Sequence, residues 1–299
     1  MKIATKLFAV ILIFAISFTA CQKEISVDTL PPAGSVADSN YLDKIYDIEI
    51  DGGVADTFNI WTYTYDANKR VIRMKAVSAE IGYPEFSDNQ YFYNGSDTLP
   101  YKSIYIYGDG NTFQLDTTIS YFYFNSLGKR IKDSVLLLSN GTSLTYSLNY
   151  YQYSGDKIYG LAKDSTIDYS GTYVNKTFDT ATVLNGNIVF NVKHGDYSRT
   201  VISSFNYDDK PSPFAKLSNS KTYIIFPSGE TLHKHMPQIN NRLKVREESF
   251  NNGISYYLYD EDLTGKYLYK PNGYPYQIYY PDPSDPSFIY KVSFVYKSL

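Results

Sequence analysis

The sequence predicts an all-β protein: one long antiparallel meander curled into a barrel-like or strongly twisted sheet. Tyrosine makes up 33 of the 299 residues, and it favours pleated, half-buried surfaces because its ring packs while its hydroxyl stays hydrated. Segments that alternate apolar and polar residues follow one another from about Tyr41 to the end of the chain. Short polar turns separate these segments, as expected for hairpins.

The first 20 residues have the layout of a secretory signal. Two lysines precede an apolar stretch from Leu7 to Phe18, and small residues then lead to Cys21, the only cysteine. The apolar stretch is shorter than the roughly 20 residues that a membrane-spanning helix needs. We therefore predict that residues 1–20 are a lipoprotein signal peptide and that Cys21 carries the lipid. A plain secretory signal with a free Cys21 is the alternative.

Residues 21–40 are predicted to be the lipidated N-terminus and a flexible linker. The segment is polar, contains Pro31, Pro32 and Gly34, and has no hydrophobic period. Lipid at Cys21 predicts the membrane as a partner. It also predicts an outer-membrane location, on the periplasmic or the cell-surface side.

Residues 41–299 are predicted to form the antiparallel β domain. Its clearest strand runs from Ile289 to Ser298, where aromatic and aliphatic residues recur at every second position. Lys291 and Lys297 belong to the opposite, less apolar face. A lysine facing lipid at the middle of a bilayer costs roughly 2–4 kcal/mol. We therefore expect the domain to be anchored to the membrane without spanning it.

The turns between strands share a pattern. Each begins with an aromatic residue, continues with Asp, Asn, Ser or Gly, and ends with a basic residue before the next strand. We expect hairpins at four such segments, 65–71, 124–131, 153–158 and 259–267. The unit recurs without a fixed period, so it is a degenerate hairpin repeat. A division into two β subdomains near residues 208–220 stays open as an alternative.

These hairpins resemble the Tyr-Asp repeats of bacterial surface proteins. Combined with the signal ending at Cys21, they resemble a family of Bacteroidetes lipoproteins with a porin-like β fold and no established activity. The segment from Phe205 to Phe214 (Phe-Asn-Tyr-Asp-Asp-Lys-Pro-Ser-Pro-Phe) is similar to a recurrent strand-end motif of such lipoproteins. The resemblance covers nearly all of residues 41–299 and implies a fold and a location, with no activity to transfer.

Composition excludes several function classes. The formal net charge is −3, and loss of Lys2 and Lys6 with the signal would make it −5. A mildly acidic chain without clustered lysine and arginine predicts no nucleic-acid partner. The mean hydropathy is −0.33, and no later segment has the length and apolarity of a transmembrane helix.

The candidate metal ligands do not assemble into a site. His233 and His235 would share one side of a strand, but zinc needs one or two further ligands. Asp260 and Asp262 begin a segment like a calcium loop, but Pro271 stands where the bidentate glutamate belongs. We therefore predict no metal and no cofactor, and a hairpin turn after Asp262.

Catalytic carboxylates are also missing from any local motif. Glycoside hydrolysis needs two carboxyl groups about 5–10 Å apart across a sugar. The doublets Asp208-Asp209 and Glu247-Glu248 cannot each form such a pair, because adjacent strand residues point to opposite faces. We predict no catalytic residue and a non-catalytic binding or scaffold module whose ligand is a glycan, a peptide or an envelope protein. A carbohydrate-active enzyme with carboxylates gathered from several strands is the alternative.

Three aromatic residues form the speculative ligand-binding group. Trp61, Tyr63 and Tyr65 share one strand face at a period of two. If exposed, their rings would stack on a sugar. If turned inward, they would be core, since aromatic cross-strand pairs stabilise a sheet by about 0.2–1 kcal/mol each. The core interpretation is the favoured one.

Overall fold

A computed structural model describes residues 40–78, 85–109, 114–139, 143–168, 171–195, 199–217, 239–281, 285 and 287–299. Within these ranges every regular element is a β-strand. The predicted signal peptide, Cys21, His233 and His235 lie outside the described residues. The all-β prediction is confirmed.

The described strands all belong to one 17-stranded sheet. The bounds of the first nine are β1 (Tyr41–Asp51), β2 (Val54–Tyr65), β3 (Val71–Ser78), β4 (Glu85–Phe92), β5 (Lys102–Asp109), β6 (Gln114–Phe124), β7 (Arg130–Ser139), β8 (Ser143–Ser154) and β9 (Lys157–Asp168). The others are β10 (Gly171–Leu184), β11 (Asn187–His194), β12 (Arg199–Pro211), β13 (Asn240–Asn251), β14 (Ile254–Asp262), β15 (Tyr267–Tyr269), β16 (Pro275–Pro281) and β17 (Ile289–Lys297).

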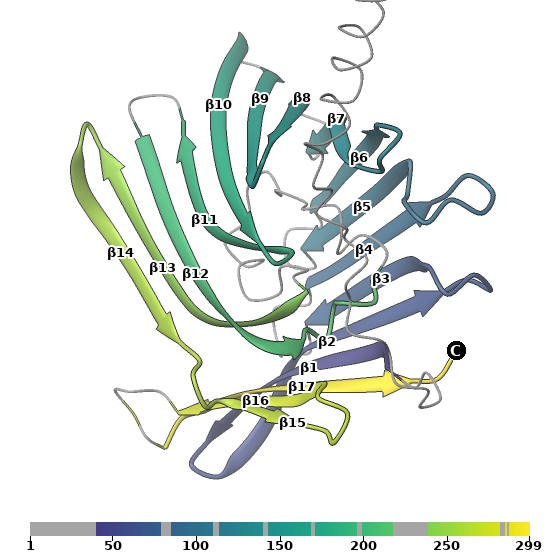
Figure 1. Cartoon of the computed structure of the whole chain (residues 1–299), viewed down its shortest axis with the longest axis vertical. Helices are drawn as coiled ribbons and strands as arrows, with labels where there is room; N and C mark the ends of the chain where they lie inside the picture. The colour runs from purple at the N-terminus through teal and green to yellow at the C-terminus, as the bar shows by residue number, and fades with distance from the viewer. Residues whose placement is uncertain are drawn as a thin grey trace, which may run out of the picture. The chain divides into compact units, whose positions relative to one another are not determined.

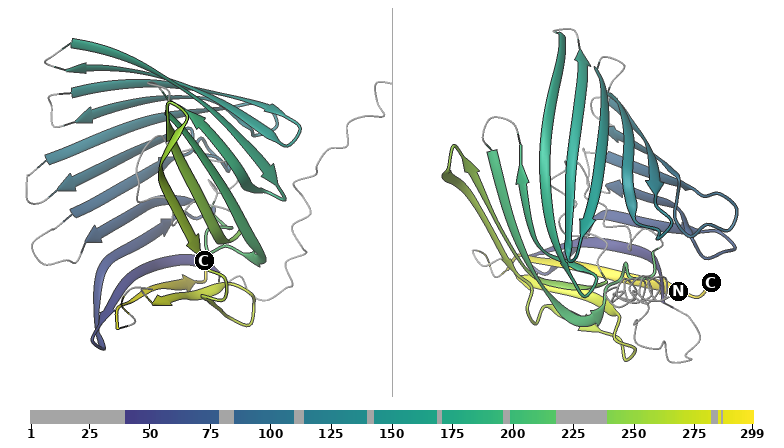
Figure 2. Two further views of the ribbon diagram at one scale, coloured as in Figure 1. Left: turned by 90° about the vertical axis from the view of Figure 1, so that its left-hand side faces the viewer. Right: turned by 45° about the horizontal axis from the view of Figure 1, so that its top comes forward.

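The topology is a meander whose two ends meet. From β1 to β14 each strand pairs antiparallel with the next, and β15, β16 and β17 continue the same way. The last strand then pairs with the first, so that Ile45 stands opposite Phe294. Figure 1 shows β1 and β17 side by side, and Figure 2 shows the twist of the strands. β12 pairs with β13, so the sheet continues past residues 208–220, the alternative domain boundary.

One expected hairpin is absent. The chain does turn at 263–266, but β14 pairs with β13 and β15 pairs with β16, and no ladder of described residues joins β14 to β15. The amide of Leu263 donates to the carbonyl of Leu243 (2.7 Å), and the carbonyl of Lys266 accepts from the amide of Tyr279 (3.0 Å). This turn therefore carries the chain from one partner strand to another, and the prediction of a hairpin here is wrong.

The two faces of the sheet differ in burial. Ile45, Trp61 and Ala76 stand opposite one another on β1, β2 and β3, on the face that we call inward. The opposite face, with Lys44 and Thr62, is the outward face. Every second residue of a strand belongs to the inward face, because the side-chain period is two.

Buried apolar side chains on the inward face form two clusters. The larger one contains Leu42, Ile45, Tyr63, Val71, Tyr91, Phe214, Leu217, Leu263, Ile278, Val292 and Phe294. The smaller one contains Tyr151, Ile158, Ala181, Ile188, Phe205 and Val245. Buried polar residues such as Asp133, Asn149 and Ser203 share this face. The inward face is thus partly polar, whereas a sheet face that packs on a core is normally apolar.

Candidate functional site

The three aromatic side chains proposed as a binding platform lie on the inward face of β2. Tyr63 is 3% exposed and belongs to the larger core cluster, while Trp61 and Tyr65 are partly buried and pack against it. Burial is the largest cause that raises the pKa of Tyr63, followed by its neighbours Tyr91 and Tyr65. The ring of Tyr65 meets that of Tyr41 edge-on at 5.5 Å between centroids. A ligand role for these residues stays a prediction, and their burial weighs against it.

A set of tyrosine hydroxyls ties neighbouring strands together at one rim of the sheet. Each lies within a few residues of one end of a strand and donates to a main-chain carbonyl near the start of another strand. The bonds run from Tyr65 to Leu42 (2.7 Å), Tyr93 to Val71 (2.7 Å), Tyr153 to Arg130 (2.8 Å), Tyr207 to Ile188 (2.7 Å), Tyr267 to Arg242 (3.0 Å) and Tyr296 to Pro275 (2.7 Å). We call these six residues the rim tyrosines.

The basic residue that ends a turn completes the same device. The guanidinium carbon of Arg70 lies 4.4 Å from the ring centre of Tyr93, whose hydroxyl bonds to the residue after Arg70. Lys129 lies 5.1 Å from the ring centre of Tyr153, whose hydroxyl bonds to the residue after Lys129. The repeated turn pattern therefore encodes a cation on the ring of the next rim tyrosine, with a hydrogen bond beside it.

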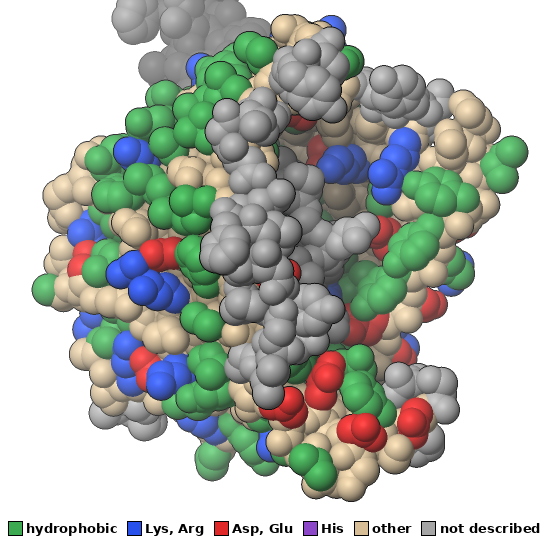
Figure 3. Space-filling model, turned by 180° about the vertical axis from the view of Figure 1, so that it is seen from behind, with side chains coloured by type: hydrophobic (Ala, Val, Ile, Leu, Met, Phe, Trp, Pro, Cys, Tyr) green, Lys and Arg blue, Asp and Glu red, His purple; other side chains and the backbone are tan. Residues whose placement is uncertain are grey.

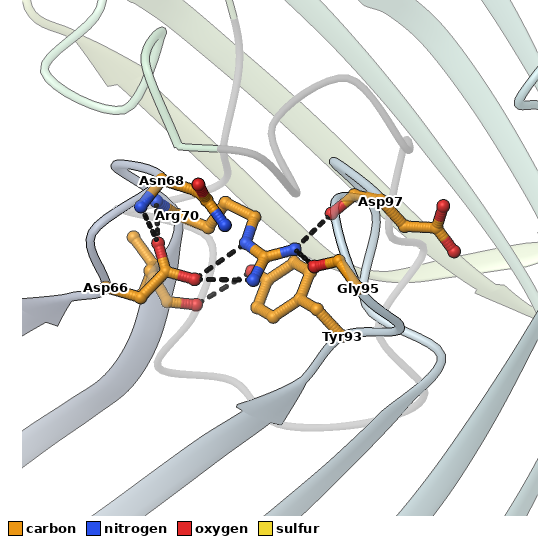
Figure 4. A network of polar contacts seen from close by, with 7 residues as sticks. Asp66, Asn68, Arg70, Tyr93, Gly95 and Asp97 are labelled. Carbon is orange, nitrogen blue, oxygen red and sulfur yellow. Dashed lines mark hydrogen bonds and ion pairs between the residues drawn. The ribbon is translucent and has the colours of Figure 1, made fainter.

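The turn at Asp66 shows the arrangement in full (Figure 4). One carboxylate oxygen of Asp66 accepts from the amides of Asn68 and Arg70, each at 2.9 Å, and the other accepts from the Arg70 guanidinium at 2.7 Å. Arg70 also donates to the carbonyls of Gly95 (2.8 Å) and Asp97 (2.7 Å) in the next hairpin. Burial alone would raise the pKa of Asp66, but the hydrogen bonds from Arg70 and Asn68 lower it overall. This network joins two successive hairpins.

A buried charge cluster lies on the inward face of β7 and β8. The Arg130 guanidinium contacts both carboxylate oxygens of Asp133, which is fully buried. The hydroxyl of Tyr151 donates to Asp133 at 2.7 Å, and the ring of Phe122 lies 4.5 Å from the guanidinium carbon. Burial raises the pKa of Asp133, and the nearby Arg130 opposes that rise. Arg130 and Tyr151 satisfy the carboxylate, so its geometry is that of a structural pair.

The acidic doublets also have structural roles. Asp208 accepts from the amides of Lys210 (3.0 Å) and Asn241 (3.1 Å), and from the hydroxyl of Tyr269. Glu247 faces inward and accepts from Ser203 at 3.3 Å, while Glu248 takes the outward position opposite Leu258. The predicted split of this doublet between the two faces is confirmed.

The segment with a calcium-loop beginning is occupied by ion pairs and a turn. Asp262 lies 2.7 Å from the Lys244 amine and accepts from the amide of Thr264 at 2.9 Å. Asp260 faces Arg246 at 3.9 Å. The described part of the chain contains no group of three His, Cys, Asp or Glu side chains placed to hold a metal ion. His194 ends β11, with its ring nitrogen 3.1 Å from the Thr200 hydroxyl.

The rim tyrosines are the feature that sequence reasoning missed. The turn pattern was visible, but the carbonyl that each hydroxyl reaches lies about one hairpin earlier in the chain. Only the register of the strands brings the two groups together. Four of the six rim tyrosines stand directly before Asp, Asn or Ser, and this recurrence is the signal in the sequence that could have found them: Tyr65, Tyr93, Tyr153 and Tyr207.

Comparisons with known proteins add little to this geometry. No protein-family model matches the chain, and no curated protein matches it. Among solved structures it is similar to a porin-like protein from Bacteroides vulgatus ATCC 8482, with 13% identity, a TM-score of 0.48, and coverage of 87% of this chain and 100% of that one. A porin-like protein from Bacteroides uniformis ATCC 8492 has 11% identity, a TM-score of 0.32, and coverage of 87% and 99%.

Both likenesses are too distant to support an argument about function. The all-β class rests on the strands of the structure itself. The lipoprotein signal and the hairpin-repeat relationship stay predictions from the sequence. Among the described residues, no helix has the length and apolarity needed to cross a membrane.

Proposed function

We propose that this chain is a lipid-anchored protein of the bacterial outer membrane that acts as a non-catalytic binding or scaffold module. The observation that carries the non-catalytic part is the placement of the inward carboxylates. The anchor part rests on the sequence around Cys21.

The register of strands β6 to β10 places other residues opposite each inward carboxylate. Asp116 stands opposite Tyr107 and Ser139, and Asp164 stands opposite Ser147 and Asn175. Asp179 stands opposite Gly160 and Lys193. No two of these described carboxylates are direct cross-strand partners, so the pairing of these strands does not set two of them side by side.

The buried Asp133 is engaged as well. It is held by Arg130 and Tyr151, whose contacts satisfy its oxygens. A carboxylate locked in this way is poorly suited to proton transfer, because its charge already stabilises a buried guanidinium. The arrangement favours a rigid frame that presents surfaces, with a glycan, a peptide or another envelope protein as the ligand.

The anchor is tested by labelling cells with an alkyne-bearing fatty acid. The wild-type chain should incorporate the label and stay with the membrane after high-salt and carbonate washes. Cys21→Ser should lose both properties. As a matched control, Cys21→Ser combined with Ser26→Cys keeps one thiol but moves it away from the signal junction, and it should also fail to be labelled. A Cys21→Ser chain that resists the washes would contradict the anchor.

The binding or scaffold role is tested in the native envelope. Chemical cross-linking followed by affinity purification of the anchored chain should recover a reproducible partner or glycan. Glycan hydrolysis by the purified chain that is abolished by Asp164→Asn would overturn the non-catalytic assignment. Asp116→Asn serves as the matched control, because it removes an inward carboxylate on another strand.

A further inference from the structure

The outward face of β5 to β11 is unusual in its apolar content. Outward positions alternate with the buried ones, so Tyr121 and Leu136 lie outward while Ser120 and Val135 lie inward. Many outward side chains are aliphatic or aromatic and exposed to solvent. They include Leu115, Tyr121, Tyr123, Leu138, Tyr146, Tyr150, Tyr159, Ile167, Val174, Phe178 and Phe190.

The exposed fractions are large for such residues. Ile167 is 52% exposed, Phe178 is 54% exposed and Val174 is 64% exposed. Sheet faces that meet only water are normally polar, and extended apolar patches mark interaction sites. Since seven neighbouring strands contribute, the patch is on the order of 30 Å wide at about 4.8 Å per strand.

Charges on these strands are sorted by face. On β5 to β10 lysines occupy outward positions and aspartates occupy inward ones, while on β11 Lys193 lies inward, opposite Asp179. The outward lysines are Lys102, Lys132, Lys157, Lys163 and Lys176, and the inward aspartates include Asp116, Asp133, Asp164 and Asp179. Among the described outward positions of β5 to β11 there is no Asp or Glu. The face is therefore positively charged as well as apolar.

Lysines and aromatic rings alternate across the strands of this face. The amine of Lys102 lies 5.4 Å from the ring centre of Phe92 and 5.5 Å from that of Tyr121. The amine of Lys132 lies 5.4 Å from the ring centre of Tyr123 and 5.8 Å from that of Tyr150. Such side chains suit a boundary between oil and water, because an apolar body carries a polar tip.

Two of the lysines oppose each other. Lys163 and Lys176 are direct cross-strand partners, and Leu148 is the neighbour of Lys163 on the other side. Like charges in opposite positions destabilise a sheet. Figure 3 views the molecule from behind, so that β5 to β8 lie at its upper left. Hydrophobic and basic side chains occur together in that part of the view.

We propose that the outward face of β5 to β11 lies flat on a bilayer surface that contains anionic, phosphate-bearing lipids. The aromatic and aliphatic side chains enter the boundary between headgroups and acyl chains, and the lysines reach the phosphates. Lys163 and Lys176 lie in the middle of the face, where a spanning sheet would put their charges in hydrocarbon, which is strongly unfavourable. The contact is therefore peripheral. It does not depend on lipid at Cys21.

A single-cysteine reporter tests which face meets the lipid. Cys21→Ser makes the full chain free of cysteine. In that background, Ser165→Cys places a thiol outward on β9 between Lys163 and Ile167, and Ser293→Cys places one outward on β17, far along the sheet. Both native serines are half-buried, so the two sites are matched. Each thiol is labelled with a polarity-sensitive dye and mixed with vesicles of phosphatidylcholine, with or without phosphatidylglycerol.

The expected result is a blue shift for the dye at residue 165 with vesicles that contain phosphatidylglycerol, and no shift at residue 293. Residues 1–20 are present in both chains, so binding through that apolar segment would not distinguish the two dyes. Equal shifts at both sites, or no shift at residue 165, would overturn the proposal. The same holds for equal shifts with neutral and anionic vesicles.

A charge variant tests the role of the lysines. Each lysine near an anionic surface contributes about 1 kcal/mol, so Lys163→Gln with Lys176→Gln should lower partitioning onto anionic vesicles by roughly 30-fold. Lys44→Gln with Lys291→Gln changes the same charge on the outward face of β1 and β17 and should leave partitioning unchanged. Equal losses in the two double variants, each with wild-type circular dichroism, would contradict the assignment of this face. Binding of an acidic protein in place of vesicles would do the same.

Discussion

The rim tyrosines show how a single hydroxyl stabilises a long sheet at the residue scale. Each hydroxyl satisfies a carbonyl near the end of a ladder, where the regular hydrogen bonds run out. Burial is the main cause that raises the pKa of Tyr65, Tyr207 and Tyr296 above that of free tyrosine. These hydroxyls therefore stay protonated and able to donate throughout the physiological pH range.

The hydroxyl of Tyr93 offers a clean test of this role. Tyr93→Phe keeps the ring under Arg70 but removes the 2.7 Å bond to Val71. A part-buried carbonyl then loses its donor, so the free energy of unfolding should fall by about 1–2 kcal/mol in urea titration. Tyr159→Phe is the control, because Tyr159 is an exposed outward residue of β9. Equal effects of the two substitutions would show that the hydrogen bond contributes nothing.

Trp61 distinguishes a core role from a ligand role. Its side chain packs against the larger core cluster, next to Ile45 and Ala76 on the adjacent strands. Trp61→Ala should therefore lower the free energy of unfolding by about 3–5 kcal/mol, through a cavity. The thermal midpoint and binding to a glycan array are measured together. Lost glycan binding at an unchanged midpoint would restore the exposed-platform interpretation.

Asp66 links residue chemistry to acid stability. Its pKa is lowered in the folded chain from the ordinary 3.8, so its charged form is stabilised by folding. The stabilisation from Asp66 is complete at pH values above the pKa of this residue in the unfolded chain. It is lost as the pH falls through the pKa of Asp66 in the folded chain. The wild type should lose stability faster than Asp66→Asn as the pH drops below about 4. The thermal midpoints of the two chains are measured as the pH is lowered. If they fall by the same amount, Asp66 does not contribute to stability in this way.

At the scale of the element, two hairpin turns use one design with different residues. Asp66 accepts from the amides of Asn68 and Arg70, as Asn125 accepts from those of Leu127 and Lys129. Each turn needs a residue with positive φ just before its last position. Lys69 fills it at 62°, and Gly128 fills it at 71° in the other turn. Glycine adopts this conformation without the strain that a side chain brings.

The two turns predict opposite effects for exchanged residues. Gly128→Ala should destabilise the chain by about 1 kcal/mol, because a Cβ at that φ is strained even though the nearest side-chain atom is 3.6 Å away. Lys69→Gly should relieve the same strain and so stabilise the chain. Loss of the contact between the Lys69 amine and the Tyr41 ring reduces that gain. Chemical denaturation of both variants measures the pair. A destabilised Lys69→Gly and a neutral Gly128→Ala would contradict the shared design.

Local pattern and tertiary register account for what the sequence does and does not predict. The alternation around Val292 and Phe294 predicts a strand and its buried face, because that face is fixed by the period of two. The turn at Leu263 to Lys266 looks like any other hairpin turn, since nothing in its residues says that β15 pairs with β16. The inward position of Trp61 was the favoured interpretation. The core cluster that it packs against also contains Val292 and Phe294 of β17, which reach it through the pairing of β17 with β1 that no local pattern encodes.

Over the whole molecule, the sorting of side chains between faces separates two tasks. The inward face holds the core clusters and the buried ionic group of Arg130 and Asp133. The outward face is uneven. On β13 and β14 it carries paired charges such as Lys244 with Asp262, whereas on β5 to β11 it carries lysines with aromatic and aliphatic residues. One sheet thus has regions suited to water and a region suited to another kind of surface.

The junction between β14 and β15 predicts where the molecule opens first. Among the residues that the structure describes, β14 forms a ladder with β13 alone, and its residues Ile254 and Tyr257 are 73% and 49% exposed. β8, by contrast, has ladders with both β7 and β9. Amides of β14 that point away from β13 lack a ladder acceptor, and the strand can leave the sheet without breaking a second ladder. Hydrogen exchange should therefore be faster along β14 than along β8. Uniform protection of the two strands would mean that β14 is covered in solution, by β15, by another segment of this chain or by a partner.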